Sequence, residues 1–470
     1  MATAVYLVFI MCCSSVSVLD TKEITDNAVY SRVVVDYEEE GSSEINNIHT
    51  IEINDFQNSE MTIKPTIPNG TVIGLETIGA QAQSAVEDGS TVIAGINCDM
   101  FAMEQLGDLI AGIPMNATII DGVLYTSAHN VGSTHRLPVF AVKSDKTPFI
   151  GTLQIEGSIK LITLDNTVEY SSYQLNKNFS LNGIAVFTSR INEDSTIRFY
   201  DIEENSAYGV NSDTLKYYII SGIEDAANIR AGVTYRGTVS NVITESLEVK
   251  IPDGCIAIVE SQNIIKSLSV GDEVELIYNI NEVIDGKKNV GSLNDIEQCV
   301  GAYNWIVKDG VVQTEEIYAE EAFPPLNYIV TTRTAKTGIG IKADGTVIAA
   351  TVDKTYVNPL SSGMTMEEWG EYFASQGAVN AVNFDGGGST EMIVINSDGA
   401  LDTVNSPTDG PSREISTGLL FISDNGEFRG YDSEELDSFT VVIIVILACM
   451  TVGYAVFAVV NYKVKKKNKK

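Results

Sequence analysis

Residues 382–392 read Val382-Asn383-Phe384-Asp385-Gly386-Gly387-Gly388-Ser389-Thr390-Glu391-Met392. An apolar run therefore ends on a carboxylate and continues into three glycines. Because glycine has no Cβ, a ligand can approach the backbone N–H groups of such a loop, and the two hydroxyls that follow add further donors. The stretch predicts an acid beside an anion-binding loop, with a glycine-rich hairpin or β-bulge as the alternative. It lacks the Gly-Lys-Ser/Thr ending of a P-loop.

Length and charge narrow the class of protein. The 470 residues suffice for two or three domains, and a hydrophobic share of 44% is ordinary for a globular protein. The formal net charge of −33 excludes a nucleic-acid binder of the usual cationic kind. We therefore expect no nucleic-acid partner.

Both ends of the sequence predict membrane targeting. Residues 1–19 are mostly apolar and end in small residues, which favours a signal peptide although the usual basic start is missing. The apolar run 439–460 would extend about 33 Å as a helix, so we expect a transmembrane helix at 439–462, with a buried soluble helix as the alternative.

The charged segments on either side of this run set the expected topology. Residues 427–438 are acidic and suit a stalk, and the lysine-rich tail 463–470 is expected in the cytosol by the positive-inside rule. The sequence thus predicts a single-pass protein in contact with the bilayer. Its N-terminal bulk would lie outside the cytosol, at a cell surface or envelope or in a secretory-pathway membrane.

Cysteine and histidine give little sign of a metal site. Outside the two apolar ends the cysteines are Cys98, Cys255 and Cys299, which allow one disulfide, and Cys255 with Cys299 is the predicted pair. No Cys or His cluster has zinc spacing. No loop has EF-hand spacing either, so we assign no metal and no cofactor, although nearby aspartates could bind a divalent cation.

The residue pattern predicts an α+β fold dominated by mixed β-sheet with few helices. Residues 20–79 alternate as strands, 91–97 read as a buried strand, and short β-branched segments fill 138–300. The clearest helix follows Thr365, a plausible N-cap, and runs to 374 before a strand at 378–384. We expect the site where strand ends from the early and late segments meet.

The order of motifs resembles the phosphodiester glycosidase family. The matching segments are 94–101, 112–114, 121–122, 335–341, 344–345, 351–353, 362–365, 377–378, 383–390 and Arg413. The triple-glycine block is the specific part of this match. The resemblance implies a glycosidase domain at 80–426 with a weakly matched β-rich middle at 190–300.

Some positions depart from the family pattern. They are Cys98, Met100, Lys354, Glu391 and Thr417. The basic residue before the Gly-Ile-Gly strand is also ambiguous: Lys336 falls on the family's usual Arg in gapless register, and Arg333 matches only after a shift. Because an ammonium and a guanidinium hold phosphate differently, this position affects substrate choice.

The resemblance implies hydrolysis of the bond between a sugar's anomeric carbon and a phosphodiester oxygen, with a phosphorylated glycan or sugar phosphodiester as substrate. It places Asp385 and Asp99 as the catalytic carboxylates and leaves open their roles and whether the enzyme is retaining or inverting. The implied phosphate- and substrate-binding residues are Gly386, Gly387, Gly388, Ser389, Thr390, Lys336, Arg333, Arg413, Asn97, Asn383 and Asp353. The alternatives are a non-catalytic module that binds phosphorylated glycans and a phosphodiesterase that breaks P–O bonds.

Overall fold

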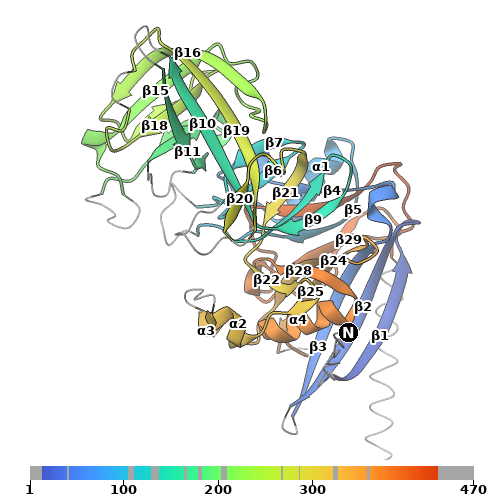
Figure 1. The fold of residues 1–470 in the computed structure, drawn as a ribbon. Coiled ribbons are helices and arrows are strands. Elements are labelled where there is room, and N and C mark those ends of the chain that lie inside the picture. The colour runs from blue at the N-terminus through green and yellow to red at the C-terminus, as the bar shows by residue number, and fades with distance from the viewer. Residues whose placement is uncertain are drawn as a thin grey trace, which may run out of the picture.

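The computed structural model describes residues 13–431 except 40–41, 104–110, 129–136, 163–166, 178–180, 182, 203–208, 266–267, 285, 321–325 and 357–359 (Figure 1). This part of the chain is mostly β-sheet, as predicted, with few helices. The α-helices in it are α1 (Ile78–Glu87), α2 (Glu315–Glu320), α3 (Leu326–Thr331) and α4 (Met366–Ser375).

The largest part of the site scaffold is an eight-stranded antiparallel sheet. Its strand order is β1 (Cys13–Glu23), β2 (Ala28–Glu39), β3 (Ser42–Ile53), β25 (Val347–Val352), β24 (Lys336–Lys342), β28 (Ala378–Asn383), β22 (Asn304–Lys308) and β23 (Val311–Val312). The early segment therefore joins the late one directly, because β3 pairs with β25.

A five-stranded sheet packs on one face of this sheet, and α4 covers the other. The second sheet has the order β30 (Leu401–Thr403), β29 (Met392–Ile395), β5 (Thr91–Asn97), β31 (Gly418–Ser423) and β4 (Met61–Thr66). In β25, Val347 and Ala349 lie in the core between the sheets, whereas Ile348 and Ala350 pack with Trp369 of α4. Because successive side chains of a strand point to opposite faces, the side chains of β25 enter two different cores, and β25 is buried along its length.

A β-rich lobe projects from these sheets, at the upper left of Figure 1. Its main path is β11 (Thr167–Ser172), β10 (Leu153–Ile162), β19 (Glu273–Ile284), β16 (Thr234–Thr244), β15 (Lys216–Ser221), β18 (Ile256–Glu260), β13 (Ile184–Phe187) and β12 (Gln174–Leu175), with β20 (Lys287–Asn289) beside β19. We call residues 153–289 the lobe.

The lobe is joined to the rest through a five-stranded sheet and a shared core. This sheet has the order β7 (Val123–Thr126), β6 (Thr118–Ile120), β21 (Ile296–Gly301), β8 (Val139–Lys143) and β9 (Pro148–Gly151). Ile119 and Leu124 from it pack in one hydrophobic core with Ile155 and Ile258 of the lobe. Two two-stranded sheets, β14 (Thr196–Arg198) with β17 (Glu248–Lys250) and β26 (Lys354–Thr355) with β27 (Ser361–Ser362), complete the named strands.

Two sequence predictions need correction. Mixed sheets were expected, yet the named strand pairs in the described ranges are antiparallel except β12 with β13. The predicted disulfide is also wrong, since Cys98, Cys255 and Cys299 are all free and buried. Cys255 packs in a core inside the lobe, whereas Cys299 lies in the core that the lobe shares with β6 and β7, so the two thiols belong to different cores.

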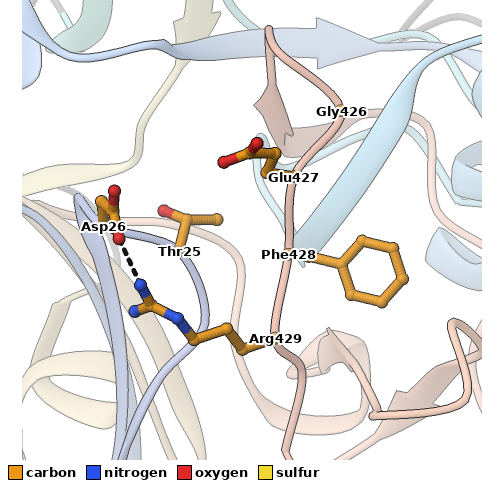
Figure 2. Close-up of a pocket in the computed structure, with 6 residues that line it drawn as sticks. All are labelled: Thr25, Asp26, Gly426, Glu427, Phe428 and Arg429. Carbon is orange, nitrogen blue, oxygen red and sulfur yellow. Dashed lines mark hydrogen bonds and ion pairs between the residues drawn. The ribbon is translucent and has the colours of Figure 1, made fainter.

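Residues 427–431 of the predicted stalk belong to the folded body, and 432–438 lie outside the described residues. Arg429 forms ion pairs with Asp26 and Glu23 near the turn between β1 and β2, and Figure 2 shows it reaching Asp26 while Phe428 points to the opposite side of the chain. Tyr431 is buried and its N–H donates to Ile395. Residues up to 431 are therefore part of the folded body.

The membrane-targeting predictions fall mostly outside the described residues. These exclude 1–12 of the predicted signal peptide and all of 432–470, and β1 overlaps the rest of the segment 1–19. Within the described ranges no helix is both long and apolar enough to cross a membrane.

Candidate active site

The glycine loop after β28 lines a cavity of about 150 Å³. The cavity lies where β28 ends, where β24 begins and where α3 and α4 approach these strand ends. Its lining residues are Met100, Tyr303, Ile329, Thr334, Ala335, Lys336, Met366, Asn383, Phe384, Asp385, Gly386 and Gly387. The predicted loop, the predicted phosphate-binding residue Lys336 and the predicted catalytic residue Asp385 therefore all line one cavity.

Backbone hydrogen bonds fix the start of this loop between two neighbouring strands. Phe384 is fully buried and its N–H donates to Thr337 of β24 over 2.8 Å. The N–H of Asp385 donates to the carbonyl of Cys98 over 2.8 Å, and the Asn97 amide donates to the Asp385 carbonyl over 2.8 Å. The ends of β5 and β28 are thus held together, as the sequence predicted for early and late strand ends.

A different structural feature favours glycine at each of the three glycine positions of the loop. Gly387 has a φ of +60°, which favours a residue without Cβ. A Cβ on Gly386 would lie 2.8 Å from the Ala335 carbonyl oxygen, and one on Gly388 would lie 2.1 Å from the Arg413 guanidinium. Gly388 therefore lets Arg413 pack directly against the loop.

Most loop amides are used within the fold. The Gly386 N–H donates to the Asp385 carboxylate over 3.0 Å, and the Gly387 N–H donates to the Ala335 carbonyl over 2.9 Å. Ser389 and Thr390 N–H groups donate back to Gly386 and Gly387. Few backbone N–H groups of the loop therefore remain to bind an anion. Binding of an anion would depend more on nearby cationic side chains.

The Asp385 carboxyl is half-buried and held by a small polar network. Burial raises its pKa, while hydrogen bonds from the Ser389 hydroxyl and Gly386 N–H and the positive charge of Arg413 oppose that rise. Arg413 donates to the Ser389 hydroxyl over 3.3 Å and pairs with Asp409. Arg413 is not among the cavity-lining residues, and its positive charge favours the ionised form of Asp385.

Asp99 follows β5 and is 2% exposed. Its N–H donates to the Thr417 hydroxyl over 3.0 Å, and its Oδ2 accepts from the Asn116 N–H over 2.7 Å. Oδ1 is buried and has no partner among the residues that the structure describes. Burial raises the pKa of Asp99 to about 7, opposed by Lys177 and reinforced by the negative charge of Asp385. The negative charge of Asp385 is thus a minor contribution to the raised pKa of Asp99.

Lys336 supplies the cation of the cavity. It is 2% exposed, and its Nζ donates to the Thr334 hydroxyl over 2.8 Å. Burial lowers its pKa to about 7, with Glu368 opposing the shift and Lys354 adding to it. Asn383, also on the cavity, donates to the Phe384 carbonyl over 2.6 Å, and its buried Oδ1 has no partner in the described ranges.

Arg333 lies away from the lining. It pairs with Glu368, the residue that closes the capping box of α4, and donates to the Gly363 carbonyl over 3.2 Å. Of the two basic residues that the sequence left open, Lys336 is the one on the cavity.

Three other predicted residues support the loop from behind. Asp353 accepts from Asn405 over 3.2 Å, and Asn405 in turn donates to the Thr390 carbonyl over 3.2 Å. Asn97 accepts from the Thr337 hydroxyl over 2.6 Å and from the Glu391 N–H over 3.1 Å. These contacts give Asp353, Thr390 and Asn97 positions that hold the loop.

The positions that depart from the family pattern are accommodated by local contacts. Glu391 is buried and accepts from the hydroxyls of Thr403 over 2.7 Å and Ser412 over 2.6 Å. Thr417 holds the Asp99 amide, and Lys354 donates to the Arg333 carbonyl over 2.5 Å. Over the described ranges no group of three His, Cys, Asp or Glu side chains is arranged to hold a metal ion.

Sequence reasoning missed Tyr303 and Lys177. Tyr303 lines the cavity just before β22, and burial raises its pKa to about 12. Lys177 interacts electrostatically with Asp99 from the lobe. Neither residue lies in a motif, so spacing along the chain gave no signal for them.

Solved structures share this fold at low sequence identity. A hypothetical protein from Synechocystis aligns with a TM-score of 0.62 and 16% identity over 86% of this chain and 64% of that one. A protein of Burkholderia pseudomallei K96243 aligns with a TM-score of 0.61 and 15% identity over 87% of this chain and 96% of that one. These matches establish the fold alone.

The sequence comparisons reach part of the chain. The SPbeta prophage-derived uncharacterized protein YomE of Bacillus subtilis (strain 168) is 29% identical over 133 residues, which are 28% of this chain and 18% of YomE. Residues 224–422 match the family model described as phosphodiester glycosidase. This region begins inside the lobe, ends in β31 and contains the glycine loop, Asp385, Lys336 and Arg413. The chain therefore carries a domain of the phosphodiester glycosidase family.

Proposed function

We propose that this protein hydrolyses the anomeric C–O bond of sugar-1-phosphodiesters of the N-acetylglucosamine-1-phosphodiester kind. The products would be the free sugar and a phosphomonoester. The observation that carries this proposal is the cavity on which the Asp385 carboxyl and the Lys336 ammonium meet beside the glycine loop. One group suits a positive anomeric centre and the other an anionic leaving group.

Cleavage of this C–O bond needs little protonation of the leaving group by a general acid. Glycoside cleavage passes through an oxocarbenium-like transition state that a carboxylate stabilises. The leaving phosphate is already anionic, and its second pKa of about 6 makes it a far better leaving group than a sugar alkoxide. Charge stabilisation by Lys336 is therefore the main requirement on the phosphate side. Asp385 and Asp99 share the task at the anomeric carbon.

Local charge also decides whether an anionic substrate can approach. The chain is acidic overall, with a formal net charge of −33. Salt screens this field beyond about 8 Å at physiological ionic strength, whereas Lys336 acts at contact distance inside the cavity. The cavity therefore suits a phosphodiester despite the acidic surface.

Replacing Asp385 tests this proposal directly. Asp385→Asn should lower turnover of a GlcNAc-1-phosphodiester by about 10²- to 10⁴-fold, as measured by free sugar released. The matched control is Asp344→Asn, since Asp344 lies in an exposed turn and accepts from the Thr346 N–H over 3.0 Å, a bond that Asn can keep. Near-normal activity of Asp385→Asn would remove Asp385 from catalysis.

The wild-type protein separates an enzyme from a binding module. Turnover with release of free sugar supports a hydrolase, and because P–O cleavage on the sugar side would give the same two products, the position of ¹⁸O from labelled water distinguishes the glycosidase from a phosphodiesterase. Binding of the phosphodiester without turnover would instead indicate a non-catalytic module for phosphorylated glycans.

We further propose that the domain acts outside the cytosol on a membrane anchor. The support is the apolar run 439–462 followed by the lysine-rich tail 463–470 and the apolar segment 1–19. The lipid bilayer is then a partner of the protein, and the substrate is expected on phosphorylated glycans in the same compartment.

A further inference from the structure

Lys177 of the lobe is buried next to the predicted carboxylates although no motif contains it. It is 4% exposed and follows β12. Its Nζ donates to the Met115 carbonyl over 2.8 Å. The N–H of the same peptide group belongs to Asn116, and it donates to Asp99 Oδ2 over 2.7 Å. A single peptide group therefore connects the Lys177 ammonium with the Asp99 carboxylate.

We propose that Lys177 is a positioning residue through which the lobe holds Asp99 ionised and correctly oriented for the reaction. This inference rests on the proposed glycosidase function, because it assigns a task to the lobe in that same site. The lobe would then complete the active site rather than act as a separate module.

The geometry supports a directed role for this contact. A peptide whose carbonyl accepts from an ammonium is polarised, so its N–H becomes a stronger donor to a carboxylate at the other end. Asp99 Oδ2 is thereby held, while Oδ1 keeps no partner in the described part of the chain. The two carboxylate oxygens of Asp99 therefore differ, because one is held by the bridging peptide and the other is buried without a partner.

The segment that carries Lys177 is itself fixed to the neighbouring sheet. Asn176 has a φ of +52°, which Asn tolerates, and its side chain donates to the Tyr125 carbonyl over 2.9 Å. Leu175 of β12 donates its N–H to the Ser127 hydroxyl over 3.1 Å. These bonds set where Lys177 leaves the lobe and direct it to Met115.

The remaining groups that interact with Asp99 do not replace Lys177. Asp385 repels its negative charge, and the thiols of Cys98 and Cys299 are buried nearby with their pKa values raised by burial and by Asp99 itself. Among the charged groups that act on Asp99, Lys177 is the cation. The peptide bridge gives each buried group one hydrogen bond, and burial moves the pKa of both groups toward the neutral form, that of Lys177 down to about 7 against the opposing charge of Asp99.

The test compares Lys177→Met with Lys177→Arg in the full chain. The titration of the Asp99 carboxyl is followed by ¹³C NMR, with the signal assigned from its loss in Asp99→Asn. Loss of the ammonium disfavours the Asp99 anion, so its titration midpoint should rise by about one pH unit in Lys177→Met and stay close to wild type in Lys177→Arg. Lys250→Met, an exposed lysine of the lobe, is the control and should leave the midpoint unchanged.

The pH–rate profile provides the second measurement. The part of the pH–rate profile that reflects ionisation of Asp99 should move to higher pH in Lys177→Met. If Lys177 had a purely structural role, its replacement would lower the rate equally at all pH values. An unchanged Asp99 midpoint in a folded Lys177→Met protein, checked by near-UV circular dichroism, would overturn the inference. Because the NMR titration needs no turnover, failure of the proposed function would show separately, as absence of activity in the wild type.

Discussion

Burial controls Lys336 and Asp385, which line the cavity, and Asp99, which is not among the lining residues. Lys336, Asp99 and Asp385 all have pKa values moved toward the neutral form, and burial is the largest cause in each case. A substrate phosphate would restore part of the lost solvation of Lys336, and a cationic anomeric centre would do so for the carboxylates. The cavity therefore offers one cationic side chain, Lys336, and one carboxyl, Asp385, to a substrate that carries the opposite charges.

Lys336 makes substrate binding depend on pH. Its pKa of about 7 in the folded protein means that it carries its charge below this pH and loses it as the pH rises. The KM for a sugar-1-phosphodiester should therefore rise above pH 7 by up to about tenfold per pH unit. Steady-state kinetics between pH 6 and 9 measure this.

Lys336→Arg is the matched variant for this pH dependence. The guanidinium stays charged, so the rise in KM over this range should disappear. A wild-type KM that is constant from pH 6 to 9 would show that the Lys336 charge does not bind the phosphate.

Some site residues could be predicted from the sequence because they are adjacent in it. Asp385 and the glycines form one contiguous loop whose composition indicates its chemistry. Tyr303 and Lys177 reach the site from segments far away in the sequence. Such contacts depend on packing between sheets, which neither composition nor periodicity encodes.

Single elements of the fold followed local sequence signals closely. The N-cap predicted at Thr365 is confirmed: its hydroxyl accepts from the Glu368 N–H, and the Glu368 side chain accepts from Thr365 in a capping box. The strand predicted at 378–384 is β28. The predicted disulfide failed because thiol spacing says nothing about which core each cysteine enters.

Gly301 at the end of β21 tests how tightly the Asp99 site is packed. A Cβ on Gly301 would lie 2.4 Å from Asp99 Oδ2 and 2.4 Å from the Asn116 Cβ. Gly301→Ala should therefore lower the free energy of unfolding by about 1–3 kcal/mol and also reduce turnover. Urea unfolding measures the first effect.

The matched control is Gly79→Ala in the first turn of α1. The nearest atom to its added Cβ lies 4.0 Å away, and alanine is the better helix former, so stability should stay equal or rise. Equal stability of Gly301→Ala and Gly79→Ala would contradict the tight packing of Asp99.

The region that matches the family, residues 224–422, does not coincide with one structural unit. The paired sheets and α4 carry the glycine loop, whereas the lobe starts at 153 and joins the rest through β6 and β7. The sequence indicated a β-rich middle at 190–300. It did not indicate that the lobe starts earlier or that Lys177 of the lobe lies near Asp99. That contact depends on how the lobe docks, which local patterns do not show.

The proposed membrane anchor has a direct test. Full-length protein should remain in the membrane fraction after alkaline carbonate extraction, and removal of residues 439–470 should release it. The physical reason is that a helix of about 20 apolar residues is held by the bilayer core rather than by surface charge. Release of the full-length protein by carbonate would refute the anchor.

The position of bond cleavage tests the proposed reaction most directly. Hydrolysis of a GlcNAc-1-phosphodiester in ¹⁸O-labelled water, followed by mass spectrometry of both products, identifies the broken bond. Carboxylates that stabilise the anomeric centre predict ¹⁸O in the released sugar and none in the phosphomonoester. Label in the phosphomonoester would mean P–O cleavage and would contradict the glycosidase mechanism.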